Sequence, residues 1–438
     1  MANTYLTRTP SSTGNRQIFT FSAWVKRSSV TTSDTLFYTG PNAATSGMIS
    51  LRFTSSGTIN VYQTDIGSFI TTNRLFRDTS AWYHIVLAID TTQATPDDRR
   101  KLYINGVQET SFSTSTEINR NLSLSVNTSG QLQRIGTYAD SSGTLENQFN
   151  GSMSHIHLID GTAYDATAFG EYDANGVWTI NTSPSVTYGT NGFFILKDGN
   201  SVTDQSGNSN NFTVGGGTLT NTEDNPSNNF CTWNPNYRGT RKDMTLTNGN
   251  TFIFEQNSGD SSVSGSIAVS GSGKYYWEQI IAQVNGTNAA LIGGMHTTED
   301  YNVTPTDVYS ENNTFGLRAN GNAYLNGTDL GNFTTADPNG DIFGIGFDVD
   351  NGAVYFWRNG TPLNSGNAVI TGVDTTKTWI CFGIQHGGAR LSTSTNWGNG
   401  YFQTTAVASA GTNASGNGIF EYDVPTGYTA LSTKGLNL

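Results

Sequence analysis

Short runs in which every second residue is apolar recur along the chain, and Asn-Gly or Ser-Gly dipeptides break them at intervals. The odd-numbered residues of Phe19–Val25 and of Tyr83–Ile89 are apolar, so an extended run would turn one apolar face toward a core. Asn105 and Gly106 follow another run, and both residue types tolerate the positive φ angles of a tight hairpin. Apolar residues at helical spacing are nowhere sustained over three turns. The pattern therefore predicts an all-β fold with very little helix.

The length and composition of the chain indicate two β domains. Its 438 residues exceed the size at which one hydrophobic core usually divides. Charged residues make up only 13% of the sequence, whereas an ordinary soluble domain has about 25%. Its 50 glycines, together with many Ser, Thr and Asn residues, are typical of short strands joined by many turns.

A stretch rich in Gly, Asn, Thr and Pro at residues 216–232 carries no apolar pattern, so we expect a connector there. This places one β-sandwich at residues 1–215 and a second at 233–438, with a single helical turn within Ala163–Gly170. Further strands are expected at Leu132–Gly136, Ser152–Ile159, Phe193–Lys197, Lys274–Ile281, Ala290–Met295, Asn313–Leu317, Ala323–Leu325, Ile342–Asp348, Gly352–Trp357, Trp379–Ile384 and Gly418–Tyr422.

The charge balance excludes some classes of partner. A formal net charge of −12 repels phosphate backbones and leaves no basic stripe for nucleic acid. We expect no membrane insertion and no export signal, because no apolar run approaches a membrane span and the first residues lack an apolar leader. Cys231 and Cys381 stand in strand-like aromatic contexts, which predicts buried free thiols.

The first half contains four blocks, which in order are FSAWVK at 21–26, WYHIV at 82–86, LYING at 102–106 and GSMS at 151–154. These blocks resemble the concanavalin A-like sandwich of the laminin G-like superfamily. The sequence DQSGN at 204–208 is similar to that family's Asp-x-Ser-Gly-Asn element, which family members often carry near the start instead. The resemblance implies a jelly roll of two antiparallel sheets.

The second half contains the blocks GKYYWE at 273–278, FGIGFD at 343–348, VYFWRNG at 354–360 and NWG at 396–398. These blocks resemble a SPRY domain, which is also a concanavalin A-like sandwich. A laminin G-like unit followed by DNPSNNF at 224–230 and by the ending PTGYTALST at 425–433 is similar to structural proteins of tailed bacteriophages, notably marine ones. That resemblance implies a virion protein, although fold alone assigns no function.

Paired carboxylates on one strand face could serve glycoside hydrolysis, which uses two acids flanking the scissile bond. Glu421 and Asp423 form one such pair, and Glu171 and Asp173 form another. Neither pair is followed by a third acidic residue, so we interpret them as ordinary strand-end carboxylates and nominate no catalytic residue.

Two further groups of residues suggest metal chemistry. His155 and His157 would share a strand face, yet no third ligand stands near them, so we expect hydrogen-bonded imidazoles. Asp204, Ser206, Asn208 and Asn210 offer alternating oxygens around a glycine, which suits calcium. Because only one of these four is a carboxylate, an Asx-turn loop without a cofactor is the preferred interpretation.

Recognition remains as the expected function. Tyr301, Tyr309, His386 and Trp397 are the candidate ligand-binding residues, since aromatic rings beside polar loop residues suit sugars and protein epitopes, although Trp397 also fits a core position. We expect a non-enzymatic virion protein, such as a tail fibre, receptor-binding protein or particle-decorating appendage. It would bind other virion proteins and host-surface glycans as a symmetric oligomer, three copies being typical of fibres. A glycan-degrading enzyme and a cellular lectin or adhesin are the alternatives.

Overall fold

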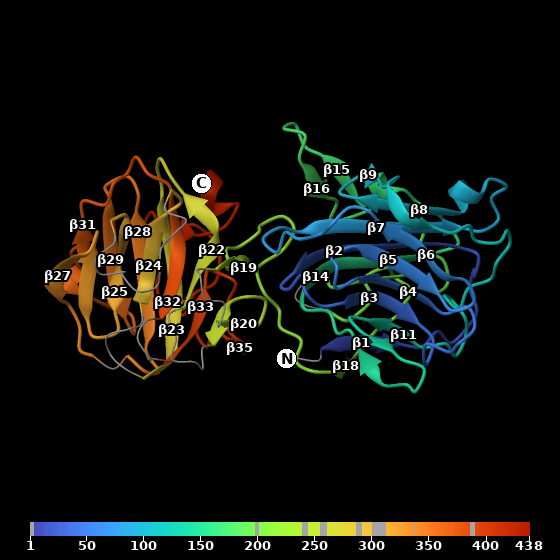
Figure 1. Cartoon of the computed structure of the whole chain (residues 1–438), viewed down its shortest axis with the longest axis horizontal. Coiled ribbons are helices and arrows are strands. Elements are labelled where there is room, and N and C mark those ends of the chain that lie inside the picture. The colour runs from blue at the N-terminus through green and yellow to red at the C-terminus, as the bar shows by residue number, and fades with distance from the viewer. Residues whose placement is uncertain are drawn as a thin grey trace. The chain divides into compact units, whose positions relative to one another are not determined.

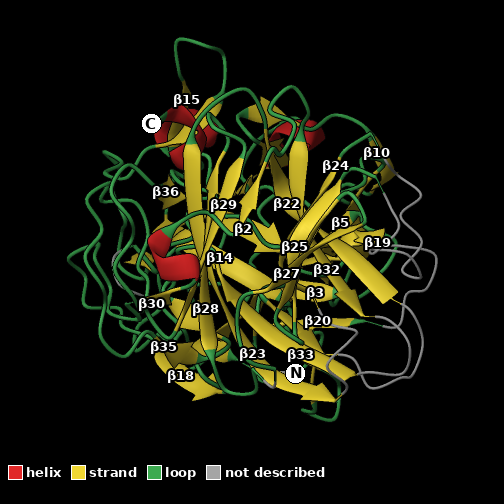
Figure 2. Ribbon diagram, turned by 90° about the vertical axis from the view of Figure 1, so that its left-hand side faces the viewer, coloured by secondary structure: helices red, strands yellow, loops and turns green. Residues whose placement is uncertain are grey.

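The computed structural model describes residues 4–197, 201–238, 244–254, 261–285, 291–299, 312–336, 338–385 and 390–438. It divides into unit 1, residues 1–221, and unit 2, residues 222–438. Strands and loops make up almost all of both units, and helix is confined to short turns (Figures 1 and 2). The all-β prediction is confirmed, and the division falls within the segment expected to be a connector.

Two antiparallel sheets form unit 1, and a hydrophobic core lies between them. The larger sheet contains, in spatial order, β10 (Phe112–Ser115), β6 (Gly67–Thr72), β5 (Ile59–Gln63), β4 (Ile49–Phe53), β3 (Asp34–Thr39), β11 (Gln133–Ile135), β1 (Tyr5–Arg8) and β18 (Thr213–Gly216). The smaller sheet contains β17 (Phe193–Ile195), β14 (Gly151–Asp160), β2 (Ile18–Arg27), β7 (Tyr83–Asp90), β8 (Arg100–Ile104) and β9 (Val107–Gln108). Outside these sheets lie the hairpins β12 (Tyr138–Ala139)–β13 (Leu145–Glu146) and β15 (Gly170–Tyr172)–β16 (Trp178–Ile180), with 3-10 turns at Pro96–Arg99 and Ala166–Ala168.

The predicted apolar faces of β2 and β7 form the centre of this core. Phe19, Phe21 and Val25 are fully buried there, as are Ile85 and Ile89. The two strands pair antiparallel from Ile18 to Val25 of β2, which brings their apolar faces to the same side of the sheet. The face assignment made from residue alternation is therefore confirmed.

The outer face of the smaller sheet is buried as well. One row of residues crosses it in register: Phe194, His157, Ser22, Val86 and Tyr103. The chain after β14 covers this face, and Ala166 and Phe169 pack there against Val86 and Ile159. The expected helical turn is confirmed at Ala166–Ala168, where the Asp165 carboxylate accepts the Thr167 N–H.

Unit 2 also consists of two sheets around a core. Its seven-stranded sheet contains β19 (Trp233–Arg238), β22 (Ser261–Val269), β32 (Trp379–Gln385), β24 (Leu291–Thr297), β25 (Thr314–Arg318), β26 (Asn322–Leu325) and β27 (Thr328–Asn332). The other sheet contains β20 (Thr245–Thr247), β21 (Phe252–Phe254), β33 (Arg390–Asn396), β23 (Lys274–Asn285), β28 (Ile342–Asp348), β29 (Ala353–Arg358) and β30 (Thr361–Pro362), with β31 (Ile370–Thr371) beside β29 and β36 (Thr429–Ala430) parallel to β23. A hairpin of β34 (Tyr401–Phe402) and β35 (Thr405–Ala406) and 3-10 turns at Asn364–Gly366 and Gly435–Asn437 complete the unit.

The two ends of the segment expected to be a connector, residues 216–232, pack on different units. Its beginning packs on unit 1, where Leu219 contacts the core. Its end packs into unit 2, where Phe230 and Cys231 are buried and Phe230 forms a β-bridge with Ser432. Burial of the Phe230 ring removes a large apolar surface from water, which explains why the end of this polar stretch packs into unit 2.

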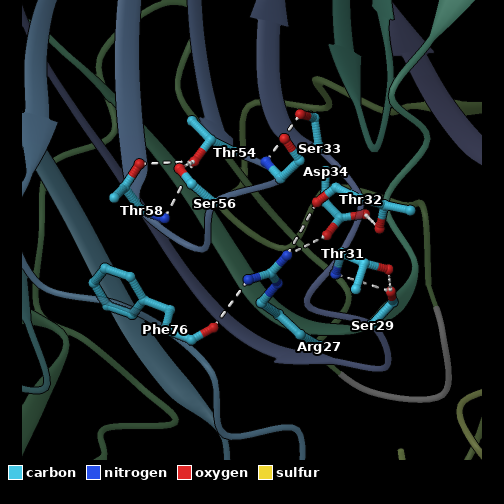
Figure 3. Close-up of polar contacts among 11 residues, drawn as sticks. Arg27, Ser29, Thr31, Thr32, Ser33, Asp34, Thr54, Ser56, Thr58 and Phe76 are labelled. Carbon is cyan, nitrogen blue, oxygen red and sulfur yellow. Dashed lines mark hydrogen bonds and ion pairs between the residues drawn. The ribbon is translucent and has the colours of Figure 1, made fainter.

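A buried ion pair closes one end of the unit 1 sandwich. Arg27 of β2 donates from Nη2 to Asp34 Oδ2 at 2.8 Å and from Nη1 to the Phe76 carbonyl at 2.9 Å (Figure 3). Its guanidinium lies over the Phe53 ring at 4.4 Å, and neither charged side chain has any exposed surface. Burial raises the pKa of Asp34, while the hydrogen bond and charge of Arg27 lower it.

We expect Arg27→Met to destabilise unit 1 by about 3–5 kcal/mol, because the substitution leaves the Asp34 carboxylate buried without its cation. The double variant Arg27→Met, Asp34→Leu should recover most of that loss. Urea denaturation, followed through the unit 1 transition, measures both effects. Arg52→Met, which alters a partly exposed arginine on β4, is the matched control and should cost less than about 1 kcal/mol. A double variant no more stable than the single one would contradict this account.

Candidate recognition site

Of the four candidate ligand-binding residues in unit 2, the structure describes Trp397. Tyr301, Tyr309 and His386 lie outside the described residues, so they stay predictions. Trp397 is fully buried in the core, where its ring meets Trp233 edge to face at 4.9 Å between centroids. This corrects Trp397 as a ligand-binding candidate, because a ring enclosed by core side chains cannot contact a ligand at the surface.

The loop at Asp204 is held by that residue's own carboxylate. Oδ1 accepts the N–H groups of Phe194 and Ser206 at 2.8 and 2.9 Å. Oδ2 accepts the Asn210 N–H at 2.8 Å and the Ser206 hydroxyl at 2.7 Å. The carboxylate thus organises an Asx-type turn beside β17, which is the kind of loop predicted for this segment.

These contacts argue against the calcium ligand set of Asp204, Ser206, Asn208 and Asn210, which we correct. Both Asp204 oxygens face donors, and Asn208 turns its amide nitrogen toward the carbonyls of two loop glycines at 2.7 and 3.1 Å. The Asn210 side-chain carbonyl accepts a hydrogen bond from the Arg8 guanidinium, so this oxygen already faces a positive charge. A calcium ion would have to displace these donors and approach that positive charge.

An open pocket of about 340 Å³ lies beside the Asp204 loop. It is lined by residues 7–9 and 11, by residues 209–211 and 213, and by Leu132. The pairing of β1 with β18 brings the first and second of these segments together. Local sequence patterns could not predict this pocket, because its walls are about 200 residues apart in the chain.

Arg8 is the one charged residue in the pocket lining, and it is 8% exposed. Its Nη1 donates to Gln133 Oε1 at 2.9 Å and to the Asn191 carbonyl at 3.2 Å. Its Nη2 donates to the side-chain carbonyls of Asn191 and Asn210. All four acceptors are neutral, and the Nε–H makes no hydrogen bond within the described residues.

Two carboxylates balance the Arg8 charge without touching it. Burial lowers the pKa of Arg8 to about 10, while the charges of Asp204 and Asp160 raise it. Asp160 accepts the N–H groups of Asn15 and Asn191 at 2.7 and 2.9 Å, which ties the chain start to this end of the sandwich. The guanidinium is therefore a compensated structural cation at the base of a polar pocket.

The acid pairs considered for glycoside hydrolysis are engaged in loops. Gly418–Tyr422, expected to be a strand, is irregular, which corrects that prediction. Glu421 accepts the Ala408 N–H at 2.8 Å, and Asp423 accepts the Thr412 N–H at 2.7 Å. In the second pair, Asp173 closes the β15–β16 turn by accepting two backbone N–H groups at 2.8 and 2.9 Å.

Glu278 on β23 is a fully buried carboxylate of unit 2 that was not among the residues predicted from the sequence. Its two oxygens accept the N–H groups of Glu421 and Tyr422 at 2.8 and 2.9 Å, so they hold the irregular segment against the sheet. Tyr276 and Asn396 donate further hydrogen bonds at 3.2 and 3.4 Å. Burial raises the pKa of Glu278 to about 7, although these hydrogen bonds oppose the shift.

The paired histidines of β14 are buried and bonded individually. A β-bulge interrupts the pairing of β14 with β2 between Ser154 and His157, and His155 has a φ of 48°. His155 Nδ1 lies 2.8 Å from the Ser154 hydroxyl, and His157 Nδ1 lies 2.9 Å from the Tyr188 hydroxyl. Within the described residues, no three His, Cys, Asp or Glu side chains gather as a metal site would require.

His84 lies at the centre of the covered outer face of unit 1. The Trp178 indole N–H donates to its Nδ1 at 3.1 Å, so the ring proton is on Nε2, which donates to Ser22 Oγ at 2.9 Å. Burial lowers the pKa of His84 to about 3, which keeps the ring neutral. Ser22 is thus a hydrogen-bond acceptor here, and the pair has no nucleophilic character.

A second Ser–His pair in unit 2 has the opposite tautomer. His296 Nδ1 lies 2.8 Å from the Thr297 carbonyl and must donate to it, so Nε2 accepts the Ser264 hydroxyl at 2.9 Å. This is the hydrogen-bond direction of a nucleophile and its base. Ser264 and His296 are only 3% and 2% exposed, however, so a substrate has no access to the hydroxyl in this structure.

The two cysteines are buried and unbridged, as predicted. Their side chains approach each other over Gly265, where an added Cβ would lie 3.2 Å from Cys231 Sγ and 3.2 Å from Cys381 Cβ. None of the helical turns in the described part of the chain has the length and apolar character of a membrane span.

The raised pKa of Glu278 makes the stability of unit 2 depend on pH. Folded Glu278 keeps its proton to a higher pH than the unfolded chain, so stability should fall as the pH rises from about 4.5 to about 7. The full loss from this group is about 3 kcal/mol. Glu278→Gln should flatten the profile in that window, as urea denaturation at several pH values would show. Glu421→Gln is the control and should leave the slope unchanged; equal slopes in wild type and Glu278→Gln would refute the assignment.

Comparison with known proteins gives one family match. Residues 2–167 match the model for laminin G-like domains of the concanavalin A-like lectin/glucanase superfamily. None of the curated proteins compared with the chain matches it significantly.

Parts of the chain are similar to solved structures of a SPRY domain, of a protein described as a putative carbohydrate binding protein and of laminin domains. The SPRY domain of human HERC1 is 19% identical over 37% of this chain and 96% of its own, with a TM-score of 0.31. A Bacteroides ovatus protein described as a putative carbohydrate binding protein is 18% identical over 50% of this chain and 57% of its own, with a TM-score of 0.33. Domains LG4-5 of the mouse laminin α1 chain are 11% identical over 90% of this chain and 87% of their own, with a TM-score of 0.29. Together with the family match over residues 2–167, the sheet topology shows that unit 1 has a concanavalin A-like β-sandwich fold, similar to that of laminin G-like domains.

Proposed function

We propose that the protein is a non-enzymatic recognition protein whose unit 1 pocket binds a neutral glycan. The proposal rests on one observation: several polar groups that line the pocket make no hydrogen bond among the described residues. Thr9 and Ser209 make no side-chain hydrogen bond, and the Asn211 amide nitrogen and the Arg8 Nε–H are also without one, in the part of the chain that the structure describes. Hydroxyl, amide and guanidinium groups of this kind match the donors and acceptors of a sugar.

The charge of the pocket favours a neutral ligand over an anionic one. Arg8 supplies one positive charge, and Asp160 and Asp204 set two negative charges against it. Attraction of an acidic sugar would therefore be weak. The volume of about 340 Å³ falls within the range of about 300–1,000 Å³ that small-ligand sites occupy.

The absence of turnover is supported by what the acidic side chains do. Glu421 and Asp423 accept loop N–H groups, and Asp173 closes a turn. Each of these three carboxylates is thereby engaged by backbone N–H groups of a loop, whereas glycoside hydrolysis requires two carboxyl groups that face the scissile bond.

The pocket gives a direct test of glycan binding. Removal of two hydroxyls by Thr9→Val, Ser209→Ala should weaken binding of a neutral oligosaccharide about tenfold, because each lost hydrogen bond is worth about 0.5–1.5 kcal/mol. A glycan array followed by calorimetry on the hits measures this effect. Ser113→Ala, Thr328→Val, which removes exposed hydroxyls elsewhere, is the control. Failure of the wild-type chain to bind any glycan would refute the proposed function.

We further propose that the protein works on a tailed-phage particle, where it binds other virion proteins as a symmetric oligomer, for example a trimer, and contacts host-surface glycans. The support is the sequence resemblance in the order of its units, in DNPSNNF at 224–230 and in the ending at 425–433. Nucleic-acid binding and membrane insertion form no part of this proposal, given the net charge of −12.

The virion proposal predicts that antibody against the chain labels purified particles and that electron cryo-microscopy locates it at defined, symmetric positions. Particles of an unrelated phage are the control. A chain found only in the infected-cell fraction, and never on particles, would show that the virion proposal is wrong and would leave glycan binding to be judged by its own test.

A further inference from the structure

The outer face of the larger sheet of unit 1 is polar where β4, β5 and β6 lie side by side (Figure 1). Leu51 of β4 and Val61 of β5 are paired and face the core. Because successive side chains of a strand alternate between its two faces, Arg52, Asn60 and Tyr62 face outward. Arg52 and Tyr62 are partly exposed, so this part of the sheet is accessible to a ligand.

The strands of this sheet are basic, although the whole protein has a formal net charge of −12. Their basic residues are Arg8, Arg52 and Arg134. Their one acid is Asp34, which is bound in the buried ion pair. Arg8 is held by its four neutral acceptors, and Arg134 donates from Nη1 and Nη2 to two loop carbonyls at 2.7 and 3.2 Å. Arg52 is therefore the arginine of these strands whose terminal nitrogens the fold leaves free.

The side chain of Asn60, which is only 4% exposed, fixes the guanidinium of Arg52. Asn60 Oδ1 accepts the Arg52 Nε–H at 3.2 Å. Asn60 Nδ2 donates to the Ile70 carbonyl at 3.2 Å and to the Ser68 and Thr71 hydroxyls, both at 3.0 Å. Because Nε–H only donates and a backbone carbonyl only accepts, these contacts determine which end of the amide carries the oxygen. One buried amide thus gathers a guanidinium and two hydroxyls around itself.

The groups that Asn60 leaves free are donors. The Ser68 and Thr71 hydroxyl oxygens accept from the amide, so their hydrogens remain for another partner. Arg52 Nη1 and Nη2 make no hydrogen bond or ion pair among the described residues, and the guanidinium lies 5.9 Å from the centre of the Tyr62 ring. We call Arg52, Ser68 and Thr71, gathered around Asn60, the Arg52 face. Donors with one positive charge are complementary to a ligand that combines a carboxylate with further oxygens.

We infer that the Arg52 face binds the carboxylate of one acidic sugar, a uronic acid residue within a glycan that is otherwise neutral. The inference goes beyond the proposed function, because it names a second surface of unit 1 and a charged sugar. The guanidinium is planar, and its two terminal nitrogens match the two oxygens of a carboxylate. The Ser68 and Thr71 hydroxyls donate to hydroxyl or ring oxygens of the same sugar.

Other acidic ligands fit this face less well. The net charge of −12 repels a polyanion such as nucleic acid or a polyuronate, whereas a single carboxylate needs only one arginine. An acidic peptide that binds as an added strand needs a free sheet edge, but β4 and β5 are paired on both sides.

Glu146, on the hairpin β12–β13, does not neutralise Arg52. Both charges act on Tyr138, whose pKa is raised by burial, Glu146 and Asp140 and lowered by Arg52. Glu146 accepts the Tyr138 hydroxyl at 3.1 Å and makes no ion pair with Arg52 in the described part of the chain. The Arg52 charge therefore stays available to a ligand.

The test uses the full chain and two ligands that differ in one group: a xylo-oligosaccharide carrying one glucuronic acid residue, and its carboxyl-reduced form, which carries glucose there. Calorimetry at low ionic strength should show about tenfold tighter binding of the acidic form, because charge-assisted hydrogen bonds exceed neutral ones. Arg52→Gln should remove that preference and leave binding of the reduced form unchanged. Arg52→Lys, which keeps the charge but loses the planar fork, should restore the preference only in part.

Arg120→Gln is the matched control. Arg120 is an exposed loop arginine of unit 1 that is also held at Nε, by the Thr92 carbonyl at 3.1 Å. Its substitution removes the same charge and should leave the preference for the acidic form intact. Equal affinity of wild type and Arg52→Gln for the acidic form would overturn the inference. A glutamate-rich peptide that binds through Arg52 more tightly than the acidic oligosaccharide would also overturn it.

The outcomes separate this inference from the proposed function. If neutral glycans bind through the pocket and the wild type does not distinguish the acidic form from the reduced one, the Arg52 face fails and the pocket stands. If the acidic form is preferred through Arg52 while the Thr9→Val, Ser209→Ala variant binds neutral glycans as well as wild type does, the pocket fails and the Arg52 face stands.

Discussion

Polar groups removed from water must be hydrogen-bonded, and in a β-sandwich most strand N–H groups are already used within the sheets. In this protein a few buried side chains therefore organise the loops. Asp204 gathers the N–H groups of its own turn, and Glu278 holds the backbone of Glu421 and Tyr422. Asn396 likewise accepts the N–H groups that follow β33 at 2.9 and 3.0 Å. A chain with only 13% charged residues can thus fix long irregular segments with single carboxylates and amides.

Burial on both faces of the central strands is the second constraint on this architecture. Strand β2 turns Phe21 toward the core and Ser22 toward the covered outer face. Strand β23 turns Trp277 toward its core and Tyr276 toward a cluster that includes Phe420. Because these outer faces are occupied, flat sheet surfaces are not available for ligands there. On these two sheets, recognition groups are left to the segments that cover or flank them.

The sequence predicted what local alternation controls. The core faces of Phe19–Val25 and of β7 followed from it, as did the turns at Asn-Gly dipeptides. It could not predict the Arg8 pocket, because register between β1 and β18 brings distant residues together. Glu278 did leave a signal, a lone acid within KYYWEQII, but the two backbone N–H groups that donate to it come from a loop more than 140 residues away. Likewise, the covered outer faces depend on long-range packing that residue alternation does not encode.

The position of the proposed pocket bears on how such a protein would adhere. The Asp204 loop beside the pocket adjoins β17, which is an edge strand of the smaller sheet of unit 1. A contact with one sugar would be weak by itself, since a few hydroxyl contacts contribute only about 1–3 kcal/mol. Repetition of the pocket across copies of the chain raises the effective concentration of the next contact, so a glycan-coated surface would be held more firmly than any soluble fragment of it.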